Sequence, residues 1–182
     1  VEPPQTSRPF LFARDSEALF LAQKVLCRKH RCRVLSFDLS WSNRKRLSLN
    51  ILPLTGVLGA EILDVDVREE SCFDEIFEAF VKYSVVAIRN QQIKPEEQLR
   101  FARHFGKINI NRFFTPHPKH PEIALVVKEP HQTMAIGESW HTDHSYDEIP
   151  CRASMLHTIE APQVGGDTGF SSMSTAFAAL SE

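Results

Sequence analysis

A histidine and an aspartate two residues apart, His141 and Asp143, have the types and the spacing that suit a metal site. In a strand, residues i and i+2 project from the same face, with Cα atoms about 6.6 Å apart. A neutral imidazole nitrogen and an anionic carboxylate oxygen suit a divalent first-row ion. With a second histidine they complete the 2-His-1-carboxylate triad of non-haem iron sites, which leaves three coordination positions open. The spacing therefore predicts that the two side chains converge on one metal ion, although the same pattern also occurs in ordinary surface ion pairs.

A glycine-containing turn follows at residues 162–168, with the sequence Pro-Gln-Val-Gly-Gly-Asp-Thr. Glycines let the backbone approach a ligand closely. The hydroxyl of Thr168 could donate a hydrogen bond to a ligand carboxylate. The turn is not a P-loop, because no lysine follows the glycines. It is either a ligand-binding turn or a simple entry into a strand.

Short strands must position these residues. The apolar pattern predicts strands or extended segments at residues 47–54, 61–67, 84–89, 123–128 and 152–158. Two intervening stretches, 109–121 and 129–139, read as loops, and long loops beside short strands often carry a functional site. In a strand geometry, residues 141 and 143 would lie side by side.

Helices are fewer. Ser71 has the side chain of an N-cap, and apolar residues follow it at i, i+3, i+4, i+7 and i+8, which predicts an amphipathic helix. The residues of this apolar stripe are Phe73, Ile76, Phe77, Phe80 and Val81. A second helix should begin at Pro95 and end at Gly106, with Leu99, Ala102 and Phe105 on its inner face. A third is predicted at residues 174–181.

The first 46 residues differ from the rest in charge. They hold ten Lys and Arg against four Asp and Glu, whereas residues 47–182 hold eleven against nineteen. Only residues 16–26 have a loosely helical apolar pattern. We therefore expect residues 1–46 to be a peripheral extension of unknown role. Residues 47–182, in which the regular strand and helix patterns lie, form the main domain, which we interpret below as part of a catalytic domain.

The bulk composition excludes several classes of protein. A chain of 182 residues with 42% hydrophobic residues suits one domain. A net charge of -2 gives no reason to expect nucleic-acid binding, and no apolar run has membrane-spanning length. Four cysteines match no disulfide framework, which favours reduced thiols in a cytoplasmic protein. Cys27, Cys32 and His30 could hold zinc, but no second ligand pair follows at finger-like spacing.

These stretches together resemble the taurine dioxygenase family, which includes the taurine and 2,4-D dioxygenases. The resemblance covers about residues 48–182 and keeps the family's order of motifs. Its iron motif is Trp-His-Thr-Asp at 140–143, and its co-substrate turn is Gly-Gly-Asp-Thr at 165–168. The other matching segments are residues 58–66, 85–92 and 98–106.

The resemblance implies a mainly β fold with flanking helices, a double-stranded β-helix of the jelly-roll, cupin-like kind that is incomplete at its C-terminal side. It also implies Fe(2+) bound by His141 and Asp143, and 2-oxoglutarate contacted by Thr168. With O2 as second co-substrate, such an enzyme hydroxylates a small organic substrate while 2-oxoglutarate becomes succinate. The expected partner is that small molecule, with self-association into a homo-oligomer left open.

The sequence departs from the family in several places. The family's third iron ligand is a downstream histidine followed by an arginine, yet the chain has no His after His157 and no Arg after Arg152. Three interpretations stay open: a fragment, a site completed by another chain, or an inactive remnant that at most binds metal or a partner. A zinc-dependent hydrolase is a further alternative. Taurine is a doubtful substrate, because Asn111, Phe114 and Gly137 replace the residues that taurine-type members carry.

Overall fold

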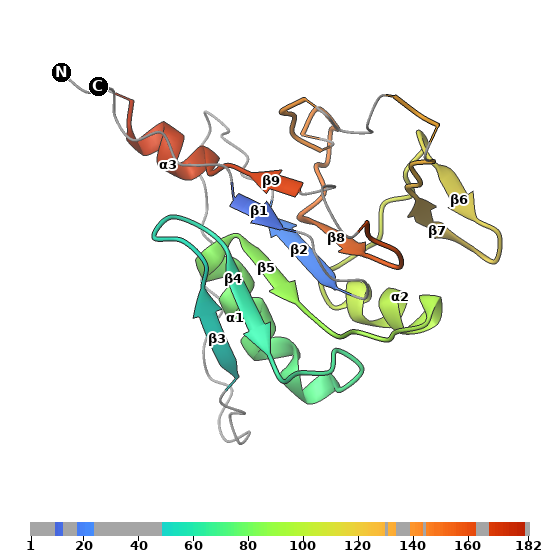
Figure 1. The fold of residues 1–182 in the computed structure, drawn as a ribbon, viewed down its shortest axis with the longest axis horizontal. Helices are drawn as coiled ribbons and strands as arrows, with labels where there is room; N and C mark the ends of the chain where they lie inside the picture. Colours follow the sequence, from blue (N-terminus) through green and yellow to red (C-terminus); the bar gives the residue numbers. More distant parts are fainter. Residues whose placement is uncertain are drawn as a thin grey trace.

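A mixed five-stranded sheet forms the centre of the fold (Figure 1). The computed structural model describes residues 10–12, 18–23, 49–129, 131–133, 139–143, 145–162 and 168–180. The strands lie in the order β3 (Asn50–Pro53), β4 (Ala60–Leu63), β5 (Val85–Ile88), β2 (Leu19–Gln23) and β8 (Ala153–His157). Only β4 and β5 pair in parallel, and the other neighbours are antiparallel. The described fold is therefore rich in strands, as expected.

Two smaller ladders and four helical segments complete the described fold. β1 (Phe10–Phe12) pairs with β9 (Thr168–Phe170), and β6 (Thr115–His117) pairs with β7 (His120–Leu125). The helical segments are the 3-10 turn η1 (Glu70–Cys72), α1 (Phe73–Tyr83), α2 (Pro95–Arg103) and α3 (Met173–Ala178). No helix among the described residues is long and apolar enough to cross a membrane.

Helix α1 connects the parallel strands β4 and β5 and covers one face of the sheet (Figure 1). The predicted apolar stripe is present, and Ile76 and Phe80 are fully buried in it. The stripe is narrower than predicted, because Val81 is 53% exposed. Ser71 is not the N-cap, since it lies within η1 and Cys72 precedes the helix. The chain leaves α1 through Ser84 in the left-handed conformation (φ 63°), where its N–H still donates to the Phe80 carbonyl at 2.8 Å.

Strand β5 confirms the prediction of a short buried strand at 84–89. All four of its residues are buried, so both faces of the sheet are covered here. Val86 and Ile88 pack in the core cluster beneath α1. Val85 and Ala87 alternate with them and join a second cluster on the opposite face, together with Leu58.

The N-terminal segment contributes the strand beside β5, which corrects two expectations. Residues 16–26 were expected to be helical, but Leu19–Gln23 form β2, paired with β5 on one side and β8 on the other. Leu19 and Leu21 have no exposed surface. Their spacing of two fits a strand, and two flanking strands satisfy the backbone of β2, so tertiary pairing outweighs the weak helical pattern. The segment is therefore not peripheral at residues 18–23, and the boundary at 46/47 stays a prediction.

Helix α2 begins at Pro95 as predicted and packs on α1 through aromatic rings. The Glu97 carboxylate accepts a hydrogen bond of 2.7 Å from the Lys94 N–H and so closes the first turn. Phe105, just beyond the helix, meets the ring of Phe73 edge-on at 5.1 Å and that of Phe80 at 5.7 Å. Offset and edge-on rings at these distances add to the stability from apolar burial.

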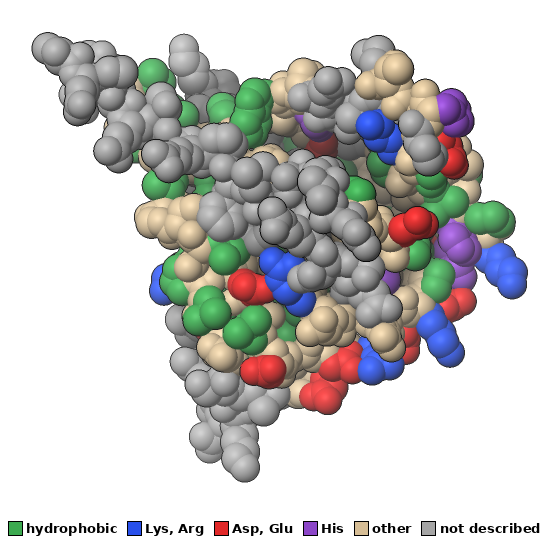
Figure 2. Space-filling model, viewed as in Figure 1, with side chains coloured by type: hydrophobic (Ala, Val, Ile, Leu, Met, Phe, Trp, Pro, Cys, Tyr) green, Lys and Arg blue, Asp and Glu red, His purple; other side chains and the backbone are tan. Residues whose placement is uncertain are grey.

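The stretch 109–121, predicted as a loop, instead contains β6 and the start of β7. The antiparallel pairing of β6 and β7 joins residues that are close in the chain. His120 of this hairpin contacts Glu96 of α2, with 2.9 Å between Nε2 and Oε1. On the face seen in Figure 2, histidine and basic side chains gather at the edge over the hairpin and α2.

Candidate metal centre

The structure brings His141 and Asp143 together. The Nε2 atom of His141 and the Oδ1 atom of Asp143 are 3.2 Å apart, and the side chains are 53% and 44% exposed. The prediction that these side chains converge is confirmed. The predicted strand is not, because residues 139–143 have no regular secondary structure and approach the sheet as an irregular segment. The pair is open to solvent, so an ion or a small molecule can reach it.

One hydrogen bond sets the tautomer of His141. Its Nδ1 atom lies 2.8 Å from the carbonyl oxygen of Ser139. A carbonyl only accepts, so Nδ1 is the protonated nitrogen of the neutral ring. In that neutral tautomer Nε2, the nitrogen that faces Asp143, carries the lone pair that a metal ion would need. Metal-binding histidines are commonly held in this way by a backbone carbonyl on the far nitrogen.

A second hydrogen bond holds the Asp143 carboxylate. The Ser154 hydroxyl in β8 donates to Oδ2 of Asp143 at 2.8 Å. The other oxygen, Oδ1, faces His141. Each member of the pair is thus held on its far side, and Nε2 of His141 and Oδ1 of Asp143 face each other. Sequence patterns did not point to Ser154, because the contact joins residues eleven positions apart in different elements.

This arrangement fits a divalent cation. Two lone-pair atoms that face each other at 3.2 Å repel unless a proton or a metal ion lies between them. Two neighbouring ligands of an octahedral ion, with bonds of about 2.1 Å at right angles, are separated by about 3.0 Å. The observed distance is close to that value. An imidazole nitrogen and a carboxylate oxygen are also the donor set that Fe(II) accepts.

A third protein ligand is not present among the residues that the structure describes. No group of three His, Cys, Asp or Glu side chains there could hold a metal ion. His157 is engaged elsewhere, since its Nε2 atom lies 2.8 Å from the carbonyl oxygen of Gln91. His144 lies outside the described residues.

Thr168 begins β9, where it is exposed and lies in register with Phe12 of β1. It therefore stands at the start of a strand, which agrees with one of the two interpretations left open for the turn. The glycines of the turn, at 165 and 166, lie outside the described residues, as do Cys27, His30, Cys32 and Gly137. The assignment of Thr168 as a co-substrate contact stays a prediction.

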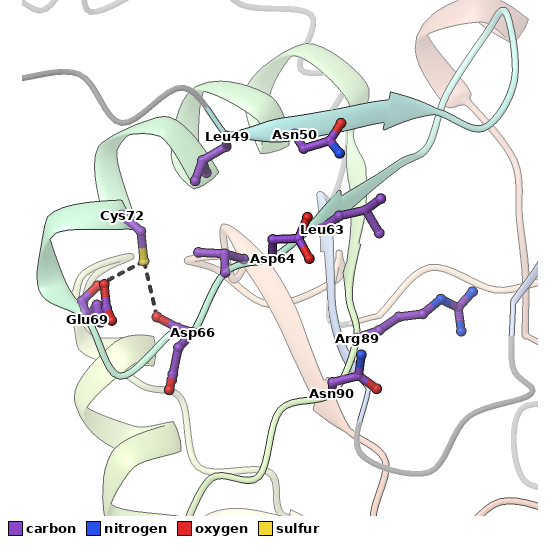
Figure 3. Close-up of a pocket in the computed structure, with 10 residues that line it drawn as sticks. Leu49, Asn50, Leu63, Asp64, Asp66, Glu69, Cys72, Arg89 and Asn90 are labelled. Atoms are coloured by element: carbon purple, nitrogen blue, oxygen red, sulfur yellow. Dashed lines mark hydrogen bonds between the residues drawn. The ribbon is translucent and has the colours of Figure 1, made fainter.

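A pocket of about 520 Å³ opens at another place, between β3, β4 and the turn into α1 (Figure 3). Cys72 and Arg89 lie at opposite ends of it. Burial raises the pKa of the Cys72 thiol to about 11. Its sulfur is directed at the carbonyl oxygens of Glu69 and Asp66, so this thiol is poorly suited to act as a nucleophile. The pocket contains none of the predicted site residues.

Comparison with known proteins gives a consistent assignment. The family model described as "Taurine catabolism dioxygenase TauD, TfdA family" matches residues 50–182. An alpha-ketoglutarate-dependent sulfonate dioxygenase of Saccharomyces cerevisiae is 29% identical over 148 residues, which are 74% of this chain and 36% of that protein. A (S)-phenoxypropionate/alpha-ketoglutarate-dioxygenase of Sphingobium herbicidovorans is 26% identical, over 74% of this chain and 49% of that protein.

A third relative is the alpha-ketoglutarate-dependent 2,4-dichlorophenoxyacetate dioxygenase of Cupriavidus pinatubonensis. It is 30% identical over 152 residues, which are 70% of this chain and 51% of that protein. The chain thus spans about a third to a half of the length of these relatives. The names of all three relatives include the same co-substrate, alpha-ketoglutarate, which is 2-oxoglutarate. The substrates in these names differ.

Proposed function

This chain belongs to the TauD, TfdA dioxygenase family, and we propose on that premise that it serves a Fe(II)- and 2-oxoglutarate-dependent hydroxylation of a small organic substrate. The observation that carries the proposal is the geometry of His141 and Asp143. Nε2 of His141 and Oδ1 of Asp143 face each other at 3.2 Å, a separation that suits two neighbouring positions of one metal ion.

In this proposal the chain's own residues bind and orient. Among the described residues, Nε2 of His141 and Oδ1 of Asp143 are the atoms that would hold Fe(II). The metal, when bound, supplies the activation of O2 that couples conversion of 2-oxoglutarate to succinate and CO2 with insertion of one oxygen atom into a substrate C–H bond. The 2.8 Å contact of Nδ1 with the Ser139 carbonyl places the proton of the neutral ring on Nδ1 and leaves Nε2 as the donor nitrogen.

Thr168 is proposed to donate its hydroxyl hydrogen bond to a 2-oxoglutarate carboxylate. Its exposed position at the start of β9 leaves that hydroxyl available to a ligand. Strands β9 and β8 both belong to antiparallel ladders with strands from the first 23 residues. These ladders support the further proposal that the chain forms one part of a double-stranded β-helix, and family membership is its main support.

The substrate is proposed to be a small organic molecule other than taurine. The relatives act, by their names, on a sulfonate, a phenoxypropionate and a chlorinated phenoxyacetate. Asn111, which occupies a position that differs from taurine-type members, accepts a hydrogen bond of 2.8 Å from the Phe113 N–H. A panel of sulfonates, sulfate esters and aryloxy acids covers the chemistry of the relatives.

The test measures succinate release with Fe(II), ascorbate, 2-oxoglutarate and each member of that panel. It is run on the 182-residue chain and on a form extended by the C-terminal half of a relative, chosen so that the extension contains a downstream His followed by an Arg. The chain alone is expected to be much slower, because two protein ligands hold Fe(II) less well than three. The missing arginine would also remove a charge-assisted partner for the 2-oxoglutarate carboxylate.

His141→Ala in the extended form should abolish succinate release, because it removes one of the two ligands. His117→Ala is the matched control, since that ring lies in β6 and contacts the Lys119 N–H rather than the pair. Equal succinate release by the His141→Ala form and its parent would refute the proposed function.

A further inference from the structure

We infer that Ser154 is a positioning residue, which turns the Asp143 carboxylate so that a single oxygen faces His141. The inference rests on the proposed function, since it takes His141 and Asp143 as metal ligands. Two distances carry it. The Ser154 hydroxyl donates to Oδ2 at 2.8 Å, and the remaining oxygen, Oδ1, lies 3.2 Å from Nε2 of His141.

Ser154 joins an irregular, exposed segment to the sheet. Residues 141–143 are exposed and have no regular secondary structure, so their backbone alone fixes the carboxylate poorly. Ser154 is half-buried in β8 and lies in register with Ala22 of β2. β8 is the edge strand of the sheet and pairs with β2, so the hydroxyl that holds Asp143 belongs to regular structure rather than to the irregular segment.

The orientation of the Asp143 carboxylate matters because it would limit how many coordination positions of the metal ion this side chain occupies. Two histidines and a carboxylate bound through one oxygen leave three of six octahedral positions for co-substrate and O2. A carboxylate bound through both oxygens would occupy one of those three. The Ser154 hydroxyl donates to Oδ2 and would so favour coordination of a bound metal through Oδ1 alone.

Ser139 orients the other proposed ligand, His141, in a similar way. The Ser139 carbonyl accepts from Nδ1 of His141, and the Ser154 hydroxyl donates to Oδ2 of Asp143. Partners of this kind, which orient a ligand without touching the metal, typically contribute about tenfold to a hundredfold to metal affinity. Only Ser154 can be removed by a side-chain substitution, because Ser139 acts through its backbone.

The test is an anaerobic titration of the whole chain with Co(II). The visible absorption of the bound Co(II) monitors the titration and reports both its affinity and its coordination. Ser154→Ala should weaken Co(II) binding by about tenfold or more and alter the absorption spectrum. Ser154→Thr keeps a hydroxyl and should restore both. Ser145→Ala is the matched control, since its hydroxyl contacts Thr142 rather than either ligand.

The melting temperature of the metal-free protein distinguishes positioning from a structural role. The contact between Ser154 and Asp143 is exposed, so Ser154→Ala should leave that temperature nearly unchanged. If Ser154→Ala does not fold, Ser154→Cys is nearly isosteric, has only a weak donor, and carries the same expectation.

The outcomes separate this inference from the proposed function. Co(II) binding that His141→Ala abolishes and Ser154→Ala leaves intact overturns the role of Ser154 alone. Binding that is absent, or that His141→Ala does not change, overturns the metal site and this inference with it. A Ser154→Thr variant as weak as Ser154→Ala also overturns the inference, because the hydroxyl would then not be the group that acts.

Discussion

Ala22 of β2 is the register partner of Ser154 in β8, so a strand from the first 46 residues adjoins the residue that holds the Asp143 carboxylate. The same strand pairs with β5 on its other side. The N-terminal segment therefore supports both the centre of the sheet and one edge of the candidate metal centre.

Removal of a side chain from β2 should destabilise the fold. Leu21 is fully buried, and Leu21→Ala is expected to lower the free energy of unfolding by about 2–5 kcal/mol, through lost apolar burial and the cavity left behind. Urea unfolding of the purified chain measures the change. Val57→Ala is the control, since that side chain is 48% exposed and a change within about 0.5 kcal/mol is expected. Equal stability of the Leu21→Ala and parent proteins would show that β2 is dispensable.

The negative charge of Asp143 should contribute more to Co(II) binding than the shape of its side chain does. Asp143→Asn keeps the size of the side chain and an oxygen, but it removes the negative charge that attracts a divalent cation. We expect it to weaken Co(II) binding more than Ser154→Ala does, that is, by more than about tenfold. Direct titration with Co(II) measures this. A neutral variant that binds as tightly as the parent would argue against Asp143 as a ligand.

Gln91 should be a stability determinant away from the site. It is 2% exposed, its Oε1 accepts from the Val67 N–H at 3.0 Å, and its Nε2 donates to the carbonyls of Val65 and Arg89 at 2.7 Å. Gln91→Ala would leave the buried Val67 N–H and two partly buried carbonyls without their partner, at a cost of about 1–3 kcal/mol in unfolding free energy. Thermal and urea unfolding test this.

The neighbouring Gln92→Ala provides the comparison for Gln91, because Gln92 is exposed and its loss should change stability by less than about 0.5 kcal/mol. If both variants lost the same stability, the buried hydrogen bonds of Gln91 would not be the cause.

Cys72 should resist alkylation in the folded protein. It is 1% exposed, and burial raises the pKa of its thiol to about 11, so the thiol stays protonated at pH 8. The thiolate is the nucleophile, and both factors therefore slow its reaction with iodoacetamide. Peptide mass mapping after brief labelling should show Cys151, which is half-buried, modified before Cys72. Equal rates in the native state, or faster labelling of Cys72, would contradict the burial.

Local patterns were enough to locate several elements. The apolar spacing from Phe73 to Phe80 indicated α1, and Pro95 marked the start of α2. The run of apolar residues at 85–88 indicated β5. These patterns were informative because a helix face or a buried strand needs apolar side chains at fixed intervals, whatever the partner is.

The sequence by itself also determined that His141 and Asp143 could converge, because residues two apart are close in any extended backbone. Their spacing and types, with the family motifs, pointed to a metal site and a co-substrate turn. That interpretation needed no knowledge of what lies next to the segment.

Tertiary structure decided the rest. A weakly periodic segment became the buried strand β2, since pairing with β5 and β8 satisfies its backbone. The segment of residues 139–143 is irregular rather than a strand, and the Asp143 carboxylate accepts a hydrogen bond from Ser154, eleven residues away in another element. Both the strand pairing of β2 and the contact of Ser154 with Asp143 depend on which segments of the chain are neighbours in the fold. The periodicity of residues along the chain carries no information about those neighbours.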